Sequence, residues 1–215
     1  MSGWLTVVTA VLTGYLSGSL PWGLWVGRLA RGIDVREHGS RNLGATNVYR
    51  TLGPGLGVLT LLLDIAKGAL PVALVPRLPG MAGFPGGASW CAVTVGVAAV
   101  LGHLFTLFAG FKGGKGVATT VGVLLALSPA AFLVFVGVFA VTLLTTRFVS
   151  LGSVLGAVAF SVSLAWFARG GWRDPVFALG VLLAVVVIAR HRDNLRRLAR
   201  GEERRFSFAG GGKRG

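Results

Sequence analysis

Long apolar runs recur along the whole chain, and they decide the kind of fold that it can adopt. They lie at 4–27, 54–76, 88–110, 117–127, 129–146, 151–168 and 175–189. Several of them approach the ~20 residues that a helix needs to cross a bilayer. Charged residues make up only 13% of the chain, about half of their usual share in a soluble domain. We therefore expect an all-α, polytopic integral membrane protein with about seven transmembrane helices.

The fourth apolar run, 117–127, is too short to span a bilayer unless its helix begins inside the preceding glycine-rich loop. Ser128 and Pro129 separate it from the fifth run. The two runs therefore form either two spans or one re-entrant hairpin. Both arrangements leave the direction of the later spans unchanged.

Basic residues predict the orientation. The chain has 21 Lys and Arg residues against 7 Asp and Glu, a net charge of +14. With the N-terminus outside, only Arg77, Arg169 and Arg173 fall in outer segments, Lys67 falls within a span, and all other basic residues are cytoplasmic. This distribution obeys the positive-inside rule. It predicts a cytoplasmic C-terminus and contact with membrane lipids. No nucleic-acid-binding motif is present, so no nucleic acid partner is expected.

A polar segment at 36–51 follows the first apolar run. Its neutral donors and its basic residues are the chemical groups that bind a phosphate ester of a polyol, and its glycines permit close approach to a ligand. The members of interest are Ser40, Asn42, Gly44, Thr46, Asn47 and Arg50. The alternative is an ordinary cytoplasmic loop with a helix cap at Thr46 or Asn47.

A second polar segment contains Lys112, Gly113, Gly114 and Lys115 ahead of an apolar run. Lysines and the N–H groups at a helix N-terminus both attract anions. The segment is not a Walker A motif, because Ala109 and Gly116 stand where that motif requires Gly and Ser or Thr. The alternative is a basic loop that anchors the topology.

A third polar segment follows the last span, where Arg190, Asn194 and Arg197 share one helix face and His191 lies beside them. A purely topological or lipid-binding role is the alternative. If all three polar segments are cytoplasmic, they can converge on one site at the inner face.

Other polar residues lie in or beside the spans. Asp64 and Lys67 are at i, i+3, and such charges mark either a functional path or an ion pair that orients the helix. Ser150 and Ser153 are helix caps or phosphate contacts. His103 is expected to serve packing or a hydrogen bond at a helix end.

Several catalytic arrangements are absent. No His is followed five residues later by Asp, which excludes the His-x4-Asp acyltransferase motif. No Cys/His cluster suggests zinc, and no Gly-x-Ser-x-Gly suggests a hydrolase. We expect neither a metal nor a cofactor.

The three segments resemble the cytoplasmic motifs of the PlsY family, the bacterial membrane glycerol-3-phosphate acyltransferases that use acyl phosphate. The matching runs are Gly39-Ser40-x-Asn42-x-Gly44-Ala45-Thr46-Asn47-x-x-Arg50, Gly110 to Thr119, and Arg190-His191-Arg192-x-Asn194 with Arg197-Leu198 and Gly201-Glu202. Asp64-x-x-Lys67-Gly68 and Gly18-Ser19-x-Pro21 also match, so the resemblance covers about 14–203. Arg41 stands where a glycine is common, and Asp193 stands where Glu is common.

The resemblance implies acyl transfer from a fatty acyl phosphate to the sn-1 hydroxyl of glycerol 3-phosphate, giving lysophosphatidic acid and inorganic phosphate in phospholipid synthesis. It implies one acyltransferase domain at 1–203, a flexible basic tail at 204–215 and a location in the bacterial inner membrane. We expect a monomer.

An acyl phosphate is a mixed anhydride with a good leaving group, so direct transfer without an acyl-enzyme is expected, with the departing phosphate as proton acceptor. The predicted catalytic residues are Ser40, His191 and Asn194, with His191 as a base or an orienting residue. The predicted substrate-binding residues are Asn42, Gly44, Thr46, Asn47, Arg50, Lys67, Lys112, Gly113, Gly114, Lys115, Ser150, Ser153 and Arg190.

Two alternatives remain at this point. A transporter for a phosphorylated metabolite would also combine spans with anion-binding loops, although it would place its polar residues near the midplane and often in symmetric repeats. A non-catalytic lipid-binding scaffold does not need three matched polar motifs.

Overall fold

The structure is a computed structural model that describes residues 2–167 and 171–207. All regular structure in these two ranges is helical, which confirms the predicted all-α class. The helices are α1 (Gly3–Gly18), α2 (Trp22–Arg31), α3 (Ala45–Leu52), α4 (Pro54–Leu74), α5 (Gly87–Leu104), α6 (Val117–Leu127), α7 (Pro129–Thr146), α8 (Val149–Phe167), α9 (Pro175–Arg190) and α10 (Arg192–Ala199).

Five helices in the described ranges are long and apolar enough to cross a membrane, or six if the bent pair α9–α10 forms one span. The first candidate, Gly3–Arg31, is interrupted between α1 and α2, because Pro21 has no N–H to continue the helix. Helix α6 has 11 residues, about 16 Å of rise, roughly half of a bilayer core. The count of seven spans and their orientation stay predictions.

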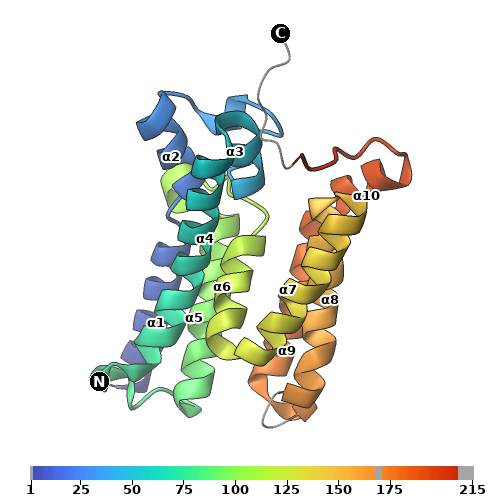
Figure 1. Ribbon diagram of the computed structural model, residues 1–215. Coiled ribbons are helices and arrows are strands. Elements are labelled where there is room, and N and C mark those ends of the chain that lie inside the picture. The colour runs from blue at the N-terminus through green and yellow to red at the C-terminus, as the bar shows by residue number, and fades with distance from the viewer. Residues whose placement is uncertain (1, 168–170, 208–215) are drawn as a thin grey trace. The chain divides into compact units, whose positions relative to one another are not determined.

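The chain divides into two compact units, Met1–Ala126 and Leu127–Phe208, and we describe each by itself. In unit 1, α1 packs on α5 along a seam of glycines. A Cβ on Gly18 would lie 1.9 Å from the carbonyl oxygen of Ala99, and one on Gly102 would lie 2.2 Å from that of Tyr15. Helices α4 and α6 meet in the same way, through Gly68 and Gly122. Figure 1 shows these helices side by side.

In unit 2, α7 and α8 form a hairpin in which aromatic rings of α7 pack against two glycines of α8. Gly152 faces Phe139, and Gly156 faces Phe135. Helix α9 packs on the other side of α8, where the Ser161 hydroxyl donates to the carbonyl of Gly180 at 2.8 Å. Helix α10 follows α9 after a bend of 56°. The three long helices and α10 are visible in Figure 1.

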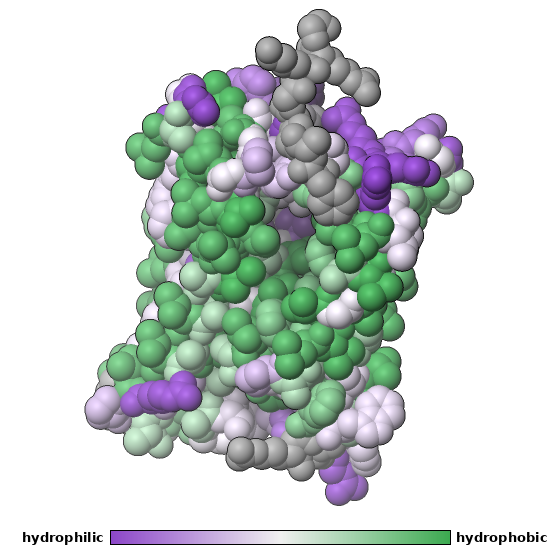
Figure 2. Space-filling view, in the orientation of Figure 1, coloured by the Kyte–Doolittle hydropathy of each residue, from purple (hydrophilic) through white to green (hydrophobic). Residues whose placement is uncertain are grey.

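Apolar side chains cover the outside of the helices in both units. Trp4, Leu62, Leu133, Leu144 and Trp166 are each more than half exposed. Figure 2 shows that the visible helix sides are mostly apolar, while strongly hydrophilic residues gather at helix ends. This pattern is expected where lipid tails, and not water, surround the helices.

The seam between α1 and α5 yields a stability prediction. Gly18→Ala places a methyl group against the Ala99 backbone, and overpacking of this kind costs about 1–3 kcal/mol. The control is Gly137→Ala in α7, where nothing lies within 4 Å of the added Cβ; there the better helix propensity of Ala adds up to ~1 kcal/mol. Thermal unfolding of the detergent-solubilised protein measures both. Equal effects of the two substitutions would contradict the close packing.

Candidate active site

The first polar segment is organised by Asn47, which is 2% exposed. Its side-chain oxygen accepts the backbone N–H of Ser40 at 2.8 Å. Its amide nitrogen donates to the carbonyls of Val35, His38 and Asn42, at 2.9, 3.2 and 2.9 Å. All of these bonds lie within the loop. Asn47 therefore shapes the loop, and its predicted contact with substrate stays a prediction.

Asn42 and Gly44 set the start of α3. The Asn42 side-chain oxygen accepts the N–H of Gly44 at 2.8 Å, and Gly44 is the N-cap residue of α3. The cap suggested for Thr46 or Asn47 thus lies two or three residues earlier. Thr46 follows in the first turn, and half-buried Arg50 lies in the last turn. Ser40 is exposed.

Arg41 has a backbone φ of 58°, in the left-handed region that glycine adopts without steric cost. The glycine that the sequence resemblance leads us to expect here would adopt this angle at lower cost. The Arg41 side chain is exposed, so the loop accommodates it at the expense of some backbone strain.

Asp34 holds the beginning of the loop, a role that the sequence analysis missed. Its carboxylate accepts the N–H of Arg36 and forms ion pairs with the Arg36 and Arg28 side chains, at 2.6 and 3.0 Å. The hydrogen bonds from Arg36 hold the pKa of Asp34 well below its usual range. An Asp two residues before Arg36 was a usable signal, because Asp commonly caps short helical turns.

The loop at 110–116 is built on the end of α5. The N–H groups of Gly113 and Gly114 donate to the carbonyls of Leu104 and His103, both at 3.2 Å. They thus satisfy carbonyls that the last turn of a helix leaves open. A Cβ on Gly113 would lie 1.9 Å from the His103 oxygen. The glycine pair is therefore required for this close approach, and its predicted contact with substrate stays a prediction.

The two lysines of this loop differ in exposure. Lys112 follows Phe111, whose φ is 60°, and it is exposed. Lys115 is half-buried. Ala109, just before the loop, packs in one apolar cluster with Leu43 and Val48 of the first polar segment. Unit 1 therefore brings the first and second polar segments together.

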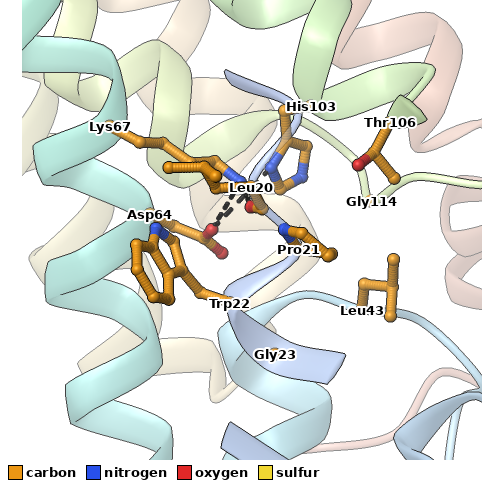
Figure 3. A pocket seen from close by; sticks show the side chains of 10 residues that line it. All are labelled: Leu20, Pro21, Trp22, Gly23, Leu43, Asp64, Lys67, His103, Thr106 and Gly114. Carbon is orange, nitrogen blue, oxygen red and sulfur yellow. Dashed lines mark hydrogen bonds and ion pairs between the residues drawn. The ribbon is translucent and has the colours of Figure 1, made fainter. Parts of the chain in front are cut away.

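Asp64 and Lys67 form a buried ion pair in α4. The two charged groups are 2.8 Å apart, and their side chains are 2% and 3% exposed. The Lys67 ammonium also donates to the carbonyl of Leu20 at 2.7 Å. The pair lines a small pocket with His103, Leu43 and Gly114, among others (Figure 3). The pocket is ≈ 10 Å³, about the space that one ordered water occupies.

In unit 2, Glu203 is hydrogen-bonded to three polar side chains. Its carboxylate accepts hydrogen bonds from Ser150 at 2.8 Å, Asn194 at 2.6 Å and Arg197 at 2.9 Å. Burial alone raises the pKa of this carboxyl, but the three hydrogen bonds outweigh burial and hold the pKa below its usual range. Ser150 and Asn194, both predicted site residues, thus meet at one oxygen. Glu202 is part of the third motif, whereas its neighbour Glu203 was not predicted from the sequence.

His191 joins α9 to α10 and is 3% exposed. Its Nδ1 lies 2.8 Å from the carbonyl oxygen of Val187, so Nδ1 carries a proton and donates to that oxygen. Ser153 donates to its own helix, to the Val149 carbonyl at 2.8 Å. Arg190, in the last turn of α9, is exposed.

The predicted tail begins with residues that make contacts. The N–H of Phe206 donates to the carbonyl of Arg147 at 2.6 Å, and the Arg205 guanidinium lies over the Phe148 ring. Residues 208–215, and Arg169 of the predicted outer loop, lie outside the described residues. The flexible tail and the single domain at 1–203 stay predictions. In the described ranges, no group of three or more His, Cys, Asp and Glu side chains is placed to hold a metal.

Comparison with known proteins identifies the family. A family model described as glycerol-3-phosphate acyltransferase matches residues 8–201. The chain belongs to the glycerol-3-phosphate acyltransferase family. A member of this name from Geobacter sulfurreducens is 48% identical over 200 residues, which are 93% of this chain and 96% of that protein. Another, from Anaeromyxobacter dehalogenans, is 46% identical over 95% of this chain and 100% of its own length.

Two solved structures extend the likeness to the fold. Both are crystal structures of PlsY (YgiH), an integral membrane glycerol 3-phosphate acyltransferase, and both are 37% identical over 94% of this chain and 96% of theirs. The glycerol 3-phosphate form has a TM-score of 0.83, and the lysophosphatidic acid form has one of 0.81. The acyltransferase family thus confirms a multi-pass membrane enzyme of PlsY type, and it excludes the transporter and scaffold alternatives.

Glu203 provides a prediction on pH dependence. Its pKa is lower in the folded protein than its ordinary value of 4.5, so its stabilising effect is complete above that value and is lost as the pH falls below it. Glu203→Gln should lower stability by about 1–3 kcal/mol at neutral pH, and the difference from wild type should shrink towards pH 3. Thermal unfolding between pH 3 and 7 measures this. A difference that does not change with pH would contradict the role of the ionised carboxylate.

Proposed function

We propose that this acyltransferase moves a fatty acyl group from an acyl phosphate to the sn-1 hydroxyl of glycerol 3-phosphate, releasing lysophosphatidic acid and inorganic phosphate. The main support is the likeness, over nearly the whole chain, to PlsY structures whose two forms carry glycerol 3-phosphate and lysophosphatidic acid. The second support is the kind of groups that the polar loops present.

Unit 1 supplies cations beside neutral hydroxyl groups. Lys112 and Ser40 are exposed, and Arg50 and Lys115 are half-buried. Leu43 of the first polar segment and Ala109, just before the second, pack in the same apolar cluster. A phosphate dianion is held by several charge-assisted hydrogen bonds of this kind. We assign the glycerol 3-phosphate phosphate to Arg50, Lys112 and Lys115, and its polyol hydroxyls to Ser40 and Thr46.

The transfer is a single displacement. The sn-1 oxygen forms a bond to the acyl carbon while the bond between that carbon and the phosphate oxygen breaks, and the departing phosphate accepts the hydroxyl proton. The enzyme contributes position and charge. Ser40 takes part in its loop through its backbone N–H, which donates to Asn47, and we assign it no covalent step.

Unit 2 contributes orienting groups. Glu203 aligns Ser150 and Asn194 through one carboxylate oxygen, and the Val187 carbonyl fixes the His191 ring. Because the leaving phosphate takes the proton, His191 orients a substrate through Nε2 and does not act as the base. Arg190 and Ser153 complete the proposed contacts of this unit.

The location follows from charge. We propose that the polar segments face the cytoplasm of a bacterial cell and that the enzyme acts as a monomer in the inner membrane. Most basic residues lie in or directly beside the segments 36–51, 110–116 and 190–214, and this distribution supports the orientation.

The kinetic test uses purified enzyme with palmitoyl phosphate and glycerol 3-phosphate, with phosphate release as the measurement. Lys112→Ala and Arg50→Ala each remove a charged phosphate contact worth about 1.5–3 kcal/mol. The KM for glycerol 3-phosphate should therefore rise about 10-fold to 100-fold, with a smaller change in the KM for the donor.

The matched control is Arg31→Ala, an exposed arginine in the last turn of α2, outside the three motifs. It should leave both KM values unchanged. Absence of lysophosphatidic acid from acyl phosphate, but formation from acyl-CoA, would refute the proposed donor. Unchanged kinetics in Lys112→Ala would refute the assignment of that residue.

A further inference from the structure

The charges of α4 are more deeply buried than the cations to which we assign the substrate phosphate. Asp64 and Lys67 are almost fully buried, and their charged groups are 2.8 Å apart. Removing two charges from water is costly, and a buried ion pair is often no more stabilising than apolar residues of the same size. The pair therefore calls for an explanation other than stability.

One side of the pair reaches the break between α1 and α2. Lys67 donates to the Leu20 carbonyl, immediately before Pro21, and the Ser17 hydroxyl donates back to the Lys67 carbonyl at 2.8 Å. A helix break leaves carbonyls without their usual donors. Lys67 supplies such a donor, so it fixes the point from which α2 leads into the first polar segment.

The other side of the pair reaches the second polar segment. His103 Nδ1 lies 3.9 Å from the Asp64 carboxylate. The dashed lines in Figure 3 mark the polar contacts among Asp64, Lys67 and their neighbours. The same histidine ring lies against Gly114, since a Cβ there would be 2.2 Å from Nε2. The backbone N–H of Gly114 donates to the His103 carbonyl at 3.2 Å.

The small pocket marks where these two connections meet. Its lining includes Leu20 and Pro21 from the helix break, Leu43 from the first polar segment and Gly114 from the second. Thr106, after α5, adds a direct tie, because its hydroxyl donates to the Ser19 carbonyl. The charged cluster thus shares packed or hydrogen-bonded neighbours with both polar segments.

We propose that Asp64, Lys67 and His103 form a positioning cluster that sets the two polar segments of unit 1 for glycerol 3-phosphate. These are positioning residues without contact to substrate, which replaces the predicted substrate contact of Lys67. The inference rests on the proposed function, because it assumes that Arg50 and Lys112 bind the phosphate of glycerol 3-phosphate.

The first test replaces the ion pair by apolar residues of similar size, in Asp64→Leu/Lys67→Met. Without an uncompensated buried charge, this variant should unfold at a temperature close to that of wild type. Its KM for glycerol 3-phosphate should rise at least 10-fold, while the KM for palmitoyl phosphate changes less. A folded double variant with wild-type kinetics for glycerol 3-phosphate would overturn the proposal.

The second test decides the question if the double variant does not fold. His103→Phe keeps a ring but removes the nitrogen that faces Asp64, so the KM for glycerol 3-phosphate should rise. His103→Asn keeps a nitrogen near the Nδ1 position and should recover part of the lost affinity. A wild-type KM in His103→Phe, or equal losses in the two variants, would contradict the positioning role.

Ser161→Ala is the control for stability alone. Ser161 is buried in unit 2 and bonds to backbone carbonyls, so its loss should lower the unfolding temperature without changing either KM. The outcomes also separate the two proposals. A wild-type enzyme that does not use acyl phosphate refutes the proposed function, whereas an active wild type with kinetically normal cluster variants refutes only the positioning role.

Discussion

The placement of the polar segments in unit 1 depends on the Lys67 ammonium, which lies between the Asp64 carboxylate and the Leu20 carbonyl. Backbone groups inside a membrane protein need partners from the protein itself. The break at Pro21 and the end of α5 both create carbonyls that need such partners. Lys67 supplies one, and Gly113 and Gly114 supply two more. The same groups that satisfy the backbone therefore place the polar loops.

The polar residues of this enzyme separate into two kinds. Asn47, Asp34 and Glu203 are occupied by bonds within their own unit, and they give the loops their shape. Lys112 and Ser40 are exposed and suited to meet a ligand. Such a division fits a reaction with an already activated donor, in which orientation and charge neutralisation contribute more than an activated nucleophile.

Local sequence patterns predicted the helices well. The run 129–146 coincides with α7 and 117–127 with α6, because Gly116 precedes α6 and Pro129 separates α6 from α7. The first run, 4–27, lies in one candidate span, but its helix is interrupted, since α1 ends at Gly18 and α2 begins at Trp22. The Pro21 signal for that break was present, but the apolar character on both sides concealed it.

The polar contacts were harder to predict because their partners are far apart in sequence. Lys67 bonds to a carbonyl 47 residues away, and Ser150 bonds to a carboxylate 53 residues away. No hydrophobic period encodes such pairs. The motif resemblance therefore located the polar segments but did not separate residues that shape a loop, such as Asn47, from those that face a ligand. Arg41 departs from the motif, and only the structure showed that its backbone has a positive φ, which favours glycine.

The central claim is that the acyl group passes directly from donor to acceptor, without an acyl-enzyme intermediate. Rapid quenching of purified enzyme with palmitoyl phosphate labelled in its acyl carbon tests it most directly. The account predicts no labelled protein when glycerol 3-phosphate is absent, and label only in lysophosphatidic acid when it is added. An acyl-protein adduct on Ser40, formed and consumed as fast as the enzyme turns over, would contradict the claim.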